Sequence, residues 1–301
     1  MANNKPEYKA DDFDPQVLGL FDQYVHGDLD RRGFLKNVAK FAAVGGMTAT
    51  GLLSALSPKF AYAQQVAQND ERIQAEYVEF DSPLGYGKGR GYLVKPVKAV
   101  GKLPVVLVVH ENRGLNPHIE DIARRLALDN FIAFAPDALY PLGGYPGDED
   151  KAREIFPKLD QAKTQEDFIA ALNFIKNSPG SNGKAGVVGF CYGGGIANLL
   201  ATRVPDLKAA VPFYGGAPAV DKVPNIKAPL LLHFAEKDDR VNAAWPGYEA
   251  ALKAAGVKYE AFKYPGVQHG FNNDTTPRYD EAAAKLAWQR TITFFNQTLR
   301  T

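Results

Sequence analysis

The stretch Val187-Val188-Gly189-Phe190-Cys191-Tyr192-Gly193-Gly194-Gly195 decides the fold of this chain. A β-branched run leads into a Gly-x-Cys-x-Gly turn, and a helix-like segment, 196–201, follows. A strand, a sharp turn with a reactive side chain at its apex and a helix are typical of a nucleophile elbow. The turn brings Gly189 and Gly193 together, so neither can carry a side chain, and the start of the helix favours a thiolate. The alternative is that Cys191 is a small buried hydrophobe before an ordinary glycine-rich turn.

Composition narrows the class of protein. The 301 residues fit one large domain or two small ones, and the hydrophobic content of 46% is ordinary for a globular protein. A net charge of +1, with no basic run that contains interleaved aromatic residues, argues against nucleic-acid binding. The single cysteine cannot form an internal disulfide or anchor a zinc-finger-type site, so it serves either packing or chemistry.

Residues 1–63 have the pattern of an export leader. The basic segment Asp30-Arg31-Arg32-Gly33-Phe34-Leu35-Lys36 precedes a weakly apolar stretch from Val38 to Leu56 and an A-x-A site at Ala61-Tyr62-Ala63. These three parts are typical of a secretory signal, and the paired arginines resemble the twin-arginine export motif of bacteria. The stretch is too polar for a membrane anchor. We therefore expect a periplasmic or secreted bacterial protein that meets the membrane only during export. The alternative is an amphipathic N-terminal helix that belongs to the fold.

After a linker at 64–76, expected strands and helices alternate over a single domain, 77–301. The expected strands are 77–80, 91–95, 103–109, 131–135, 185–190, 209–213, 230–234 and 259–264, and the expected helices are 119–128, 152–155, 165–175, 241–254 and 279–299. The first two strands form an antiparallel pair, and 103–109 is a continuous apolar run typical of a strand buried on both faces. The order predicts an α/β fold with a mostly parallel central sheet and helices on both faces.

In such a sheet the chemistry gathers at the carboxyl ends of the strands. A thiol nucleophile needs a base, and the base needs an acid that orients it. His269 lies in a turn-rich loop after the last expected strand, while Asp238 and Asp239 follow the strand 230–234. His233 lies within an apolar strand, so we expect it in the core. The chain order of nucleophile, acid and base is that of α/β-hydrolases.

Five motifs resemble the dienelactone hydrolase (carboxymethylenebutenolidase-like) family, a branch of the α/β-hydrolases that uses cysteine in place of serine. They are Val109-His110-Glu111-Asn112-Arg113-Gly114-Leu115-Asn116, Ala135-Pro136-Asp137-Ala138-Leu139-Tyr140, Gly189-Phe190-Cys191-Tyr192-Gly193-Gly194, Glu236-Lys237-Asp238-Asp239-Arg240-Val241 and His269-Gly270-Phe271. The resemblance implies that Cys191 is the nucleophile and His269 the base. It favours Asp238 over Asp239 as the acid, because the family acid precedes a valine by three positions, as Asp238 precedes Val241.

The loop after the strand 103–109 supplies further candidates. The resemblance implies that Glu111 controls the proton of the resting thiol; the alternative is that it caps a helix or pairs with Arg113 or Arg124. We expect the backbone N–H groups of Asn112 and Tyr192 to form the oxyanion hole. Arg113 either offers a positive charge to an acidic substrate or pairs with a carboxylate.

Two loops differ from those of the best-known members. The arginines that hold the dienelactone carboxylate in those proteins have no match in 140–145 or 270–273, so dienelactone is not the expected substrate. Tyr140, Tyr145 and Phe271 instead predict an apolar pocket. We expect a hydrolase that cleaves a small-molecule ester or lactone through a Cys-Asp-His triad and needs no metal or organic cofactor. The alternatives are an exported binding protein that keeps the scaffold without turnover, and a redox-active thiol, which the absence of a resolving cysteine disfavours.

Overall fold

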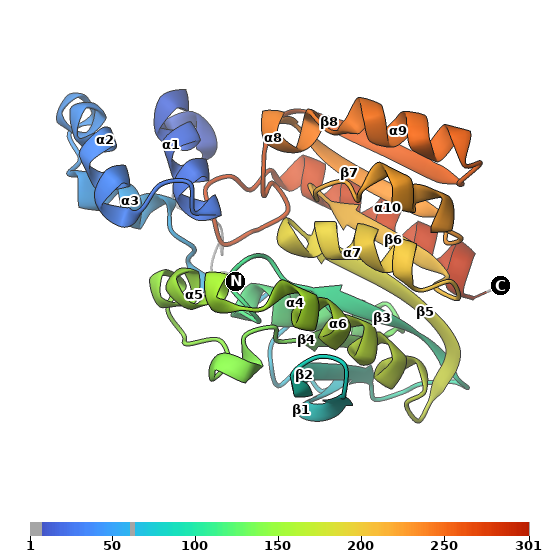
Figure 1. The fold of residues 1–301 in the computed structure, drawn as a ribbon. Helices are drawn as coiled ribbons and strands as arrows, with labels where there is room; N and C mark the ends of the chain where they lie inside the picture. The colour runs from blue at the N-terminus through green and yellow to red at the C-terminus, as the bar shows by residue number, and fades with distance from the viewer. Residues whose placement is uncertain (1–7, 61–63, 301) are drawn as a thin grey trace.

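The central sheet has eight strands in the order β1-β2-β4-β3-β5-β6-β7-β8, as the computed structural model in Figure 1 shows for residues 8–60 and 64–300. The strands are β1 (Ile73–Ser82), β2 (Gly87–Pro96), β3 (Leu103–Val109), β4 (Ile132–Pro136), β5 (Ser181–Phe190), β6 (Ala209–Phe213), β7 (Leu230–Lys237) and β8 (Tyr259–Gln268). β2 pairs antiparallel with β1 and with β4, and the other pairs are parallel. The predicted mostly parallel sheet is confirmed.

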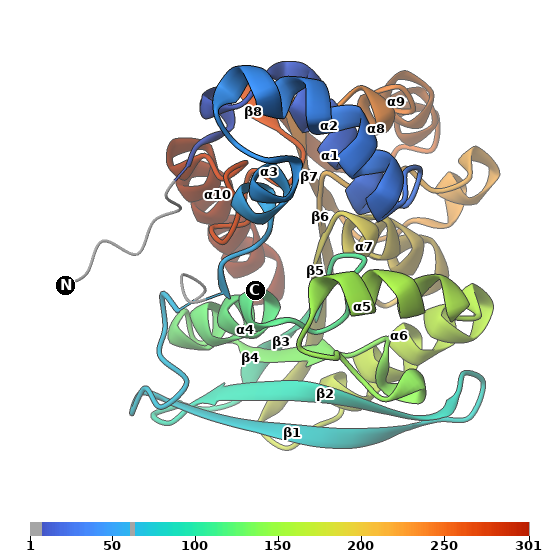
Figure 2. The same ribbon diagram turned by 90° about the vertical axis from the view of Figure 1, so that its left-hand side faces the viewer.

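Helices cover both faces of this sheet, as Figure 2 shows. α4 (Pro117–Leu128) and α10 (Glu281–Leu299) pack on one face, while α6 (Gln161–Lys176), α7 (Tyr192–Arg203) and α9 (Trp245–Ala254) pack on the other. The short helices are α5 (Glu149–Ile155) and α8 (Asp239–Asn242), and the 3-10 turns are η1 (Ala10–Asp12), η3 (Tyr140–Leu142), η4 (Phe156–Lys158) and η5 (Val220–Asn225). Two hydrophobic cores result, one on each side of the sheet.

The apolar run of β3 explains its central position. All seven of its side chains are buried, and alternate residues enter opposite cores: Val105 and Leu107 pack on one side, and Val106 and Val108 on the other. A strand that alternates between two apolar layers has no polar face to offer to water. The predicted bounds of this strand, 103–109, are those that the structure has.

The helix expected over 241–254 is two helices, α8 and α9. α8 begins after Asp238, whose side chain accepts a hydrogen bond from the amide of Val241. α9 begins at Trp245 and carries Pro246 in its first turn. Proline lacks an N–H group and is tolerated only at the start of a helix. It therefore separates the two helices.

Residues 8–60 form a helical unit at one end of the sheet (Figures 1 and 2). Its helices are α1 (Pro15–His26), α2 (Arg31–Gly45) and α3 (Ala49–Leu56), capped at their N-termini by Asp14, Asp30 and Thr48. They enclose a core separate from the two cores of the sheet. The predicted fold left this segment out and was wrong to do so, because these residues pack against the domain that follows.

The helices of this unit are what the alternative, a fold-forming N-terminal helix, predicted. Ala61-Tyr62-Ala63 lies outside the described residues, and export stays a prediction. Among the helices that the structure describes, none is long and apolar enough to cross a membrane.

Candidate active site

Cys191 lies at the apex of a tight turn between β5 and α7. Its backbone has φ 55° and ψ −112°, a conformation that residues other than glycine rarely adopt. A Cβ atom on Gly189 would lie 1.9 Å from the carbonyl oxygen of Gly193, and one on Gly193 would lie 2.2 Å from that of Val109. Only glycine fits at either position. The turn predicted from the Gly-x-Cys-x-Gly pattern is therefore present, with its thiol at the carboxyl end of a central strand.

The structure brings His269 and Asp238 together beside this thiol. Nδ1 of His269 is 2.6 Å from Oδ2 of Asp238, and Oδ1 of Asp238 accepts from the amide of Val241 at 3.3 Å. A ring nitrogen of His269 lies within 4.8 Å of the Cys191 sulfur. His269 and Asp238 are buried, whereas Asp239 is exposed. This arrangement favours Asp238 over Asp239 as the partner of the imidazole.

The electrostatics of the site favour an ion pair. Burial alone would raise the pKa of the Cys191 thiol, but the imidazole of His269 and then that of His26 outweigh it and lower the pKa to about 6. Burial would lower the pKa of His269, but Cys191 and Asp238 raise it to about 10. At neutral pH the site therefore holds a thiolate beside an imidazolium, which is the reactive form of a cysteine nucleophile.

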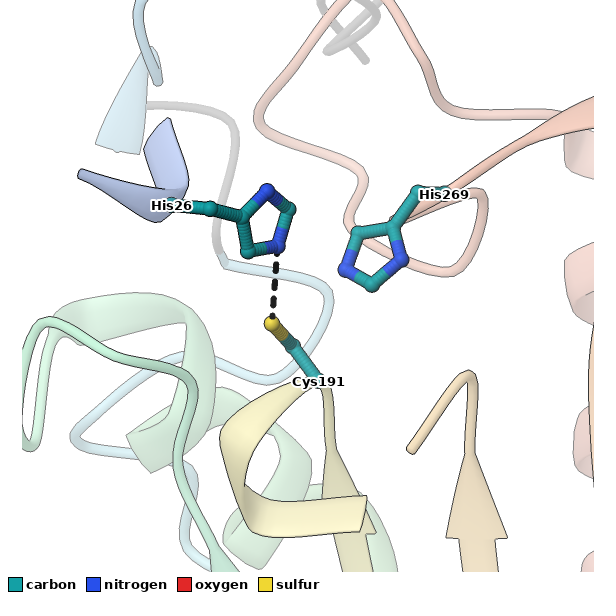
Figure 3. A group of neighbouring side chains, drawn as sticks. All are labelled: His26, Cys191 and His269. Carbon is teal, nitrogen blue, oxygen red and sulfur yellow. Dashed lines mark hydrogen bonds between the residues drawn. The ribbon is translucent and has the colours of Figure 1, made fainter. Parts of the chain in front are cut away.

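A second histidine, which the sequence analysis assigned to the leader, also contacts the thiol. Nε2 of His26 lies 3.5 Å from the Cys191 sulfur, and Figure 3 shows the rings of His26 and His269 around it. Nδ1 of His26 lies 3.3 Å from the carboxylate of Asp22. The caps of α1 signalled a folded helix here: Asp14 with Pro15 at its start, and Gly27 in a left-handed conformation at its end.

These three side chains are also a candidate metal-binding group, since one ligand atom from each lies within 4.8 Å of the others. One cysteine and two histidines form a donor set that suits zinc. However, the guanidinium of Arg240 donates to Nε2 of His26 at 2.8 Å. This cation occupies the nitrogen that a metal ion would need. The arrangement therefore fits acid–base chemistry better than metal binding.

The loop after β3 contacts the N-terminal unit. The side-chain amide of Asn112 donates to the backbone oxygen of Val25 at 2.9 Å, and NH2 of Arg113 donates to the same oxygen at 2.7 Å. Arg113 is buried and also lies 3.9 Å from Glu149. Glu111 accepts a hydrogen bond from the side chain of Asn273 at 3.0 Å.

Each of the two open alternatives for this loop has an outcome in these contacts. The carboxylate partner observed for Arg113 is Glu149, which agrees with the alternative of pairing with a carboxylate. The charged partners observed for Arg124 are Asp121 and Glu120. The contact observed for Glu111 is thus with Asn273, in the loop after β8. Tyr192, the other expected oxyanion residue, is the first residue of α7.

The three aromatic residues expected around the substrate lie elsewhere. Phe271 is fully buried in the core beside Tyr214 and Tyr264. Tyr140 and Tyr145 line a different cavity of about 360 Å³, and their hydroxyl groups donate to Glu79 and Glu149. The predicted aromatic pocket is therefore wrong in its position, because the hydroxyl bonds turn both tyrosines away from the thiol and core packing holds Phe271.

Comparisons with known proteins place these features in context. Residues 90–299 match the model of the dienelactone hydrolase family, and residues 5–43 match that of the YqhI-like family. The "Putative carboxymethylenebutenolidase" of Salmonella typhi is 36% identical over 221 residues, 68% of this chain and 82% of that protein. The "Putative hydrolase fragment YghX" of Escherichia coli (strain K12) is 56% identical over 114 residues, 38% of this chain and 97% of that protein. The crystal structure of "Putative Dienelactone Hydrolase from Klebsiella pneumoniae subsp. pneumoniae MGH 78578" has a TM-score of 0.65 at 30% identity and covers 74% of this chain and 99% of that one.

Proposed function

The chain belongs to the dienelactone hydrolase family, and from this premise we propose that it hydrolyses a small-molecule ester or lactone with Cys191 as nucleophile. The observation that carries the proposal is the 2.6 Å hydrogen bond between His269 and Asp238 beside a thiol held at a strained turn. A nucleophile, a base and an acid that orients the base are the three parts of a catalytic triad. The binding-protein alternative gives no reason for a strained thiol beside a buried imidazole–carboxylate pair.

The first half of the reaction forms a thioacyl-enzyme. The Cys191 thiolate attacks the ester carbonyl, and the carbonyl oxygen becomes an oxyanion held by the backbone N–H groups of Asn112 and Tyr192. When the intermediate collapses, the bond to the leaving oxygen breaks and His269 gives that oxygen its proton. Asp238 stabilises the imidazolium until the proton leaves.

The second half releases the acid. His269, now neutral, takes a proton from a water molecule, and the resulting hydroxide attacks the thioester carbonyl. The new oxyanion uses the same two amides, and the thiolate of Cys191 leaves while His269 keeps the proton. Every step uses groups of this chain and water. Glu111, at the rim of the site, is proposed to influence the proton of the thiol, and its bond with Asn273 fixes its orientation.

A substrate screen tests this proposal. Purified full chain and its Cys191→Ala variant are compared on a panel of activated esters and lactones, with Arg203→Ala as a surface control. We expect turnover by the wild type and the control, and a loss of about a thousandfold or more in Cys191→Ala. Hydrolysis by Cys191→Ala at the wild-type rate would contradict the proposal. We also propose that residues 1–63 direct export to the periplasm, which fractionation of the native host would test.

A further inference from the structure

The end of α1 occupies the space above the thiol. The backbone oxygen of Val25 accepts hydrogen bonds from the side chains of Asn112 and Arg113, and the next residue, His26, places its ring 3.5 Å from the Cys191 sulfur. Both donors belong to the loop that is proposed to bind the oxyanion of the substrate. A carbonyl oxygen of the protein itself is thus held beside the nucleophile, where the carbonyl of an ester would need to approach.

Little room remains for a substrate. The cavity bounded by Glu111, Asn112 and Arg113 is closed on its other side by Phe21, Tyr24 and Val25 of α1, and it holds about 50 Å³. Pockets that bind small molecules usually hold roughly 300–1,000 Å³. Cys191 is only 8% exposed. In this arrangement, an ester cannot reach the sulfur unless α1 moves.

Polar contacts hold α1 and α2 in place. Asp22 pairs with Arg278 of the loop before α10 at 3.2 Å. Tyr24 and Arg31 both contact the carboxylate of Asp150 in α5. Arg153, also in α5, lies over the ring of Tyr24 with its guanidinium carbon 4.1 Å from the ring centre. All of these partners are polar or charged groups that water can solvate once the contact is broken.

The apolar side chains of residues 8–60 pack mainly on one another. Their core contains the buried residues Phe13, Val17, Leu18, Phe21, Tyr24, Phe34, Val38, Ala42, Leu52, Leu53 and Leu56. The two cores of the sheet draw their buried residues from position 66 onward. Displacing the helical unit would therefore break polar contacts at its edge and leave all three hydrophobic cores intact.

We propose that residues 8–60 are an autoinhibitory cap, which keeps the hydrolase closed in the full chain until the cap is displaced or cut away. The inference rests on the proposed function, because it assigns the cap to the catalytic thiol. It also gives the predicted cleavage site a second consequence: the cap ends directly before Ala61-Tyr62-Ala63, and a cut after Ala63 would separate cap from catalytic domain. A precursor would then be inactive where it is made, and active once it is processed.

Thiol accessibility tests the cap without relying on hydrolysis. Cys191 is the only cysteine, so the rate of its alkylation by iodoacetamide can be followed from the mass of the intact full chain. The double variant Tyr24→Phe with Arg31→Ala removes the contacts with Asp150 and keeps an aromatic ring in the cap core. Arg203→Ala is the matched control, since it removes an ion pair with Glu166 at the far end of α7.

We expect the double variant to be alkylated about tenfold faster than the wild type, and to hydrolyse an activated ester faster by a similar factor, because each lost polar contact is worth about a factor of five. The control should change neither rate. In a second measurement, residues 61–63 of the full chain are replaced by the recognition sequence of a site-specific protease, and the cut should raise both rates further.

The outcomes separate the cap from the catalytic proposal. Faster alkylation without ester hydrolysis supports the cap and contradicts the proposed function. Ester hydrolysis with alkylation unchanged by both loosening and cutting overturns the cap. A fall in hydrolysis on loosening or cutting also overturns it, because His26 would then act as a part of the catalytic site that the reaction needs.

Discussion

Replacing His269 with glutamine should raise the pKa of the Cys191 thiol from about 6 to its ordinary value of 9.0 or above. Burial raises this pKa, and the imidazole of His269 is the strongest influence that lowers it, with His26 second. Because one pKa unit corresponds to about 1.4 kcal/mol, the wild-type site favours the thiolate by about 4 kcal/mol over a free thiol. Without the ring of His269, burial meets only the weaker effect of His26.

The thiolate absorbs in the ultraviolet, so a pH titration of the full chain measures this pKa directly. The single cysteine assigns the signal, and the Cys191→Ala variant supplies the background from the 14 tyrosines. Thiolate appears as the pH rises through the pKa, so the wild-type midpoint should lie near 6 and that of His269→Gln at 9.0 or higher. His26→Gln should give a smaller rise. A wild-type midpoint near 9.0, or a midpoint that stays near 6 in His269→Gln, would refute the reasoning.

Three further substitutions probe the acid, the turn and the core. Asp238→Asn should lower kcat for ester hydrolysis by about a thousandfold, since it removes the charge that stabilises the imidazolium of His269; steady-state kinetics showing less than a tenfold loss would contradict its role. Gly189→Ala should lower the free energy of unfolding by about 1–3 kcal/mol or more in urea titrations, because its Cβ would meet the oxygen of Gly193; an unchanged midpoint would show that the turn can relax. Phe271→Ala should destabilise the fold by about 3–5 kcal/mol, as expected for a buried aromatic residue, whereas a residue that only lines a pocket would alter KM and leave the urea midpoint in place.

The sheet could be predicted from sequence because its signals are local. The apolar run of β3 and the glycines around Cys191 each have one structural solution, and the structure has both. His233 was expected in the core, where it is fully buried between Tyr264 and Thr291. In each case the physical constraint acts between residues close in sequence, or on a strand whose neighbours are all apolar.

The rest of the site depends on contacts between segments far apart in sequence. The distance from His26 to Cys191 spans 165 positions, and no local pattern indicates that contact. An export motif within the same residues favoured a leader that contributes nothing to the fold. The positions of Tyr140 and Tyr145 depend on carboxylates that their hydroxyl groups find only in the folded chain. Composition could identify these loops as aromatic, but it could not show which way the rings point.

Trapping the acyl-enzyme tests the central claim most directly. The full chain is mixed with a slowly deacylating activated ester, quenched in acid and measured as an intact mass, followed by peptide mapping. The account predicts a gain equal to one acyl group on Cys191, which disappears in Cys191→Ala and accumulates further when Asp238→Asn slows deacylation. Acylation of another residue, or turnover of the ester with Cys191 never modified, would contradict the account.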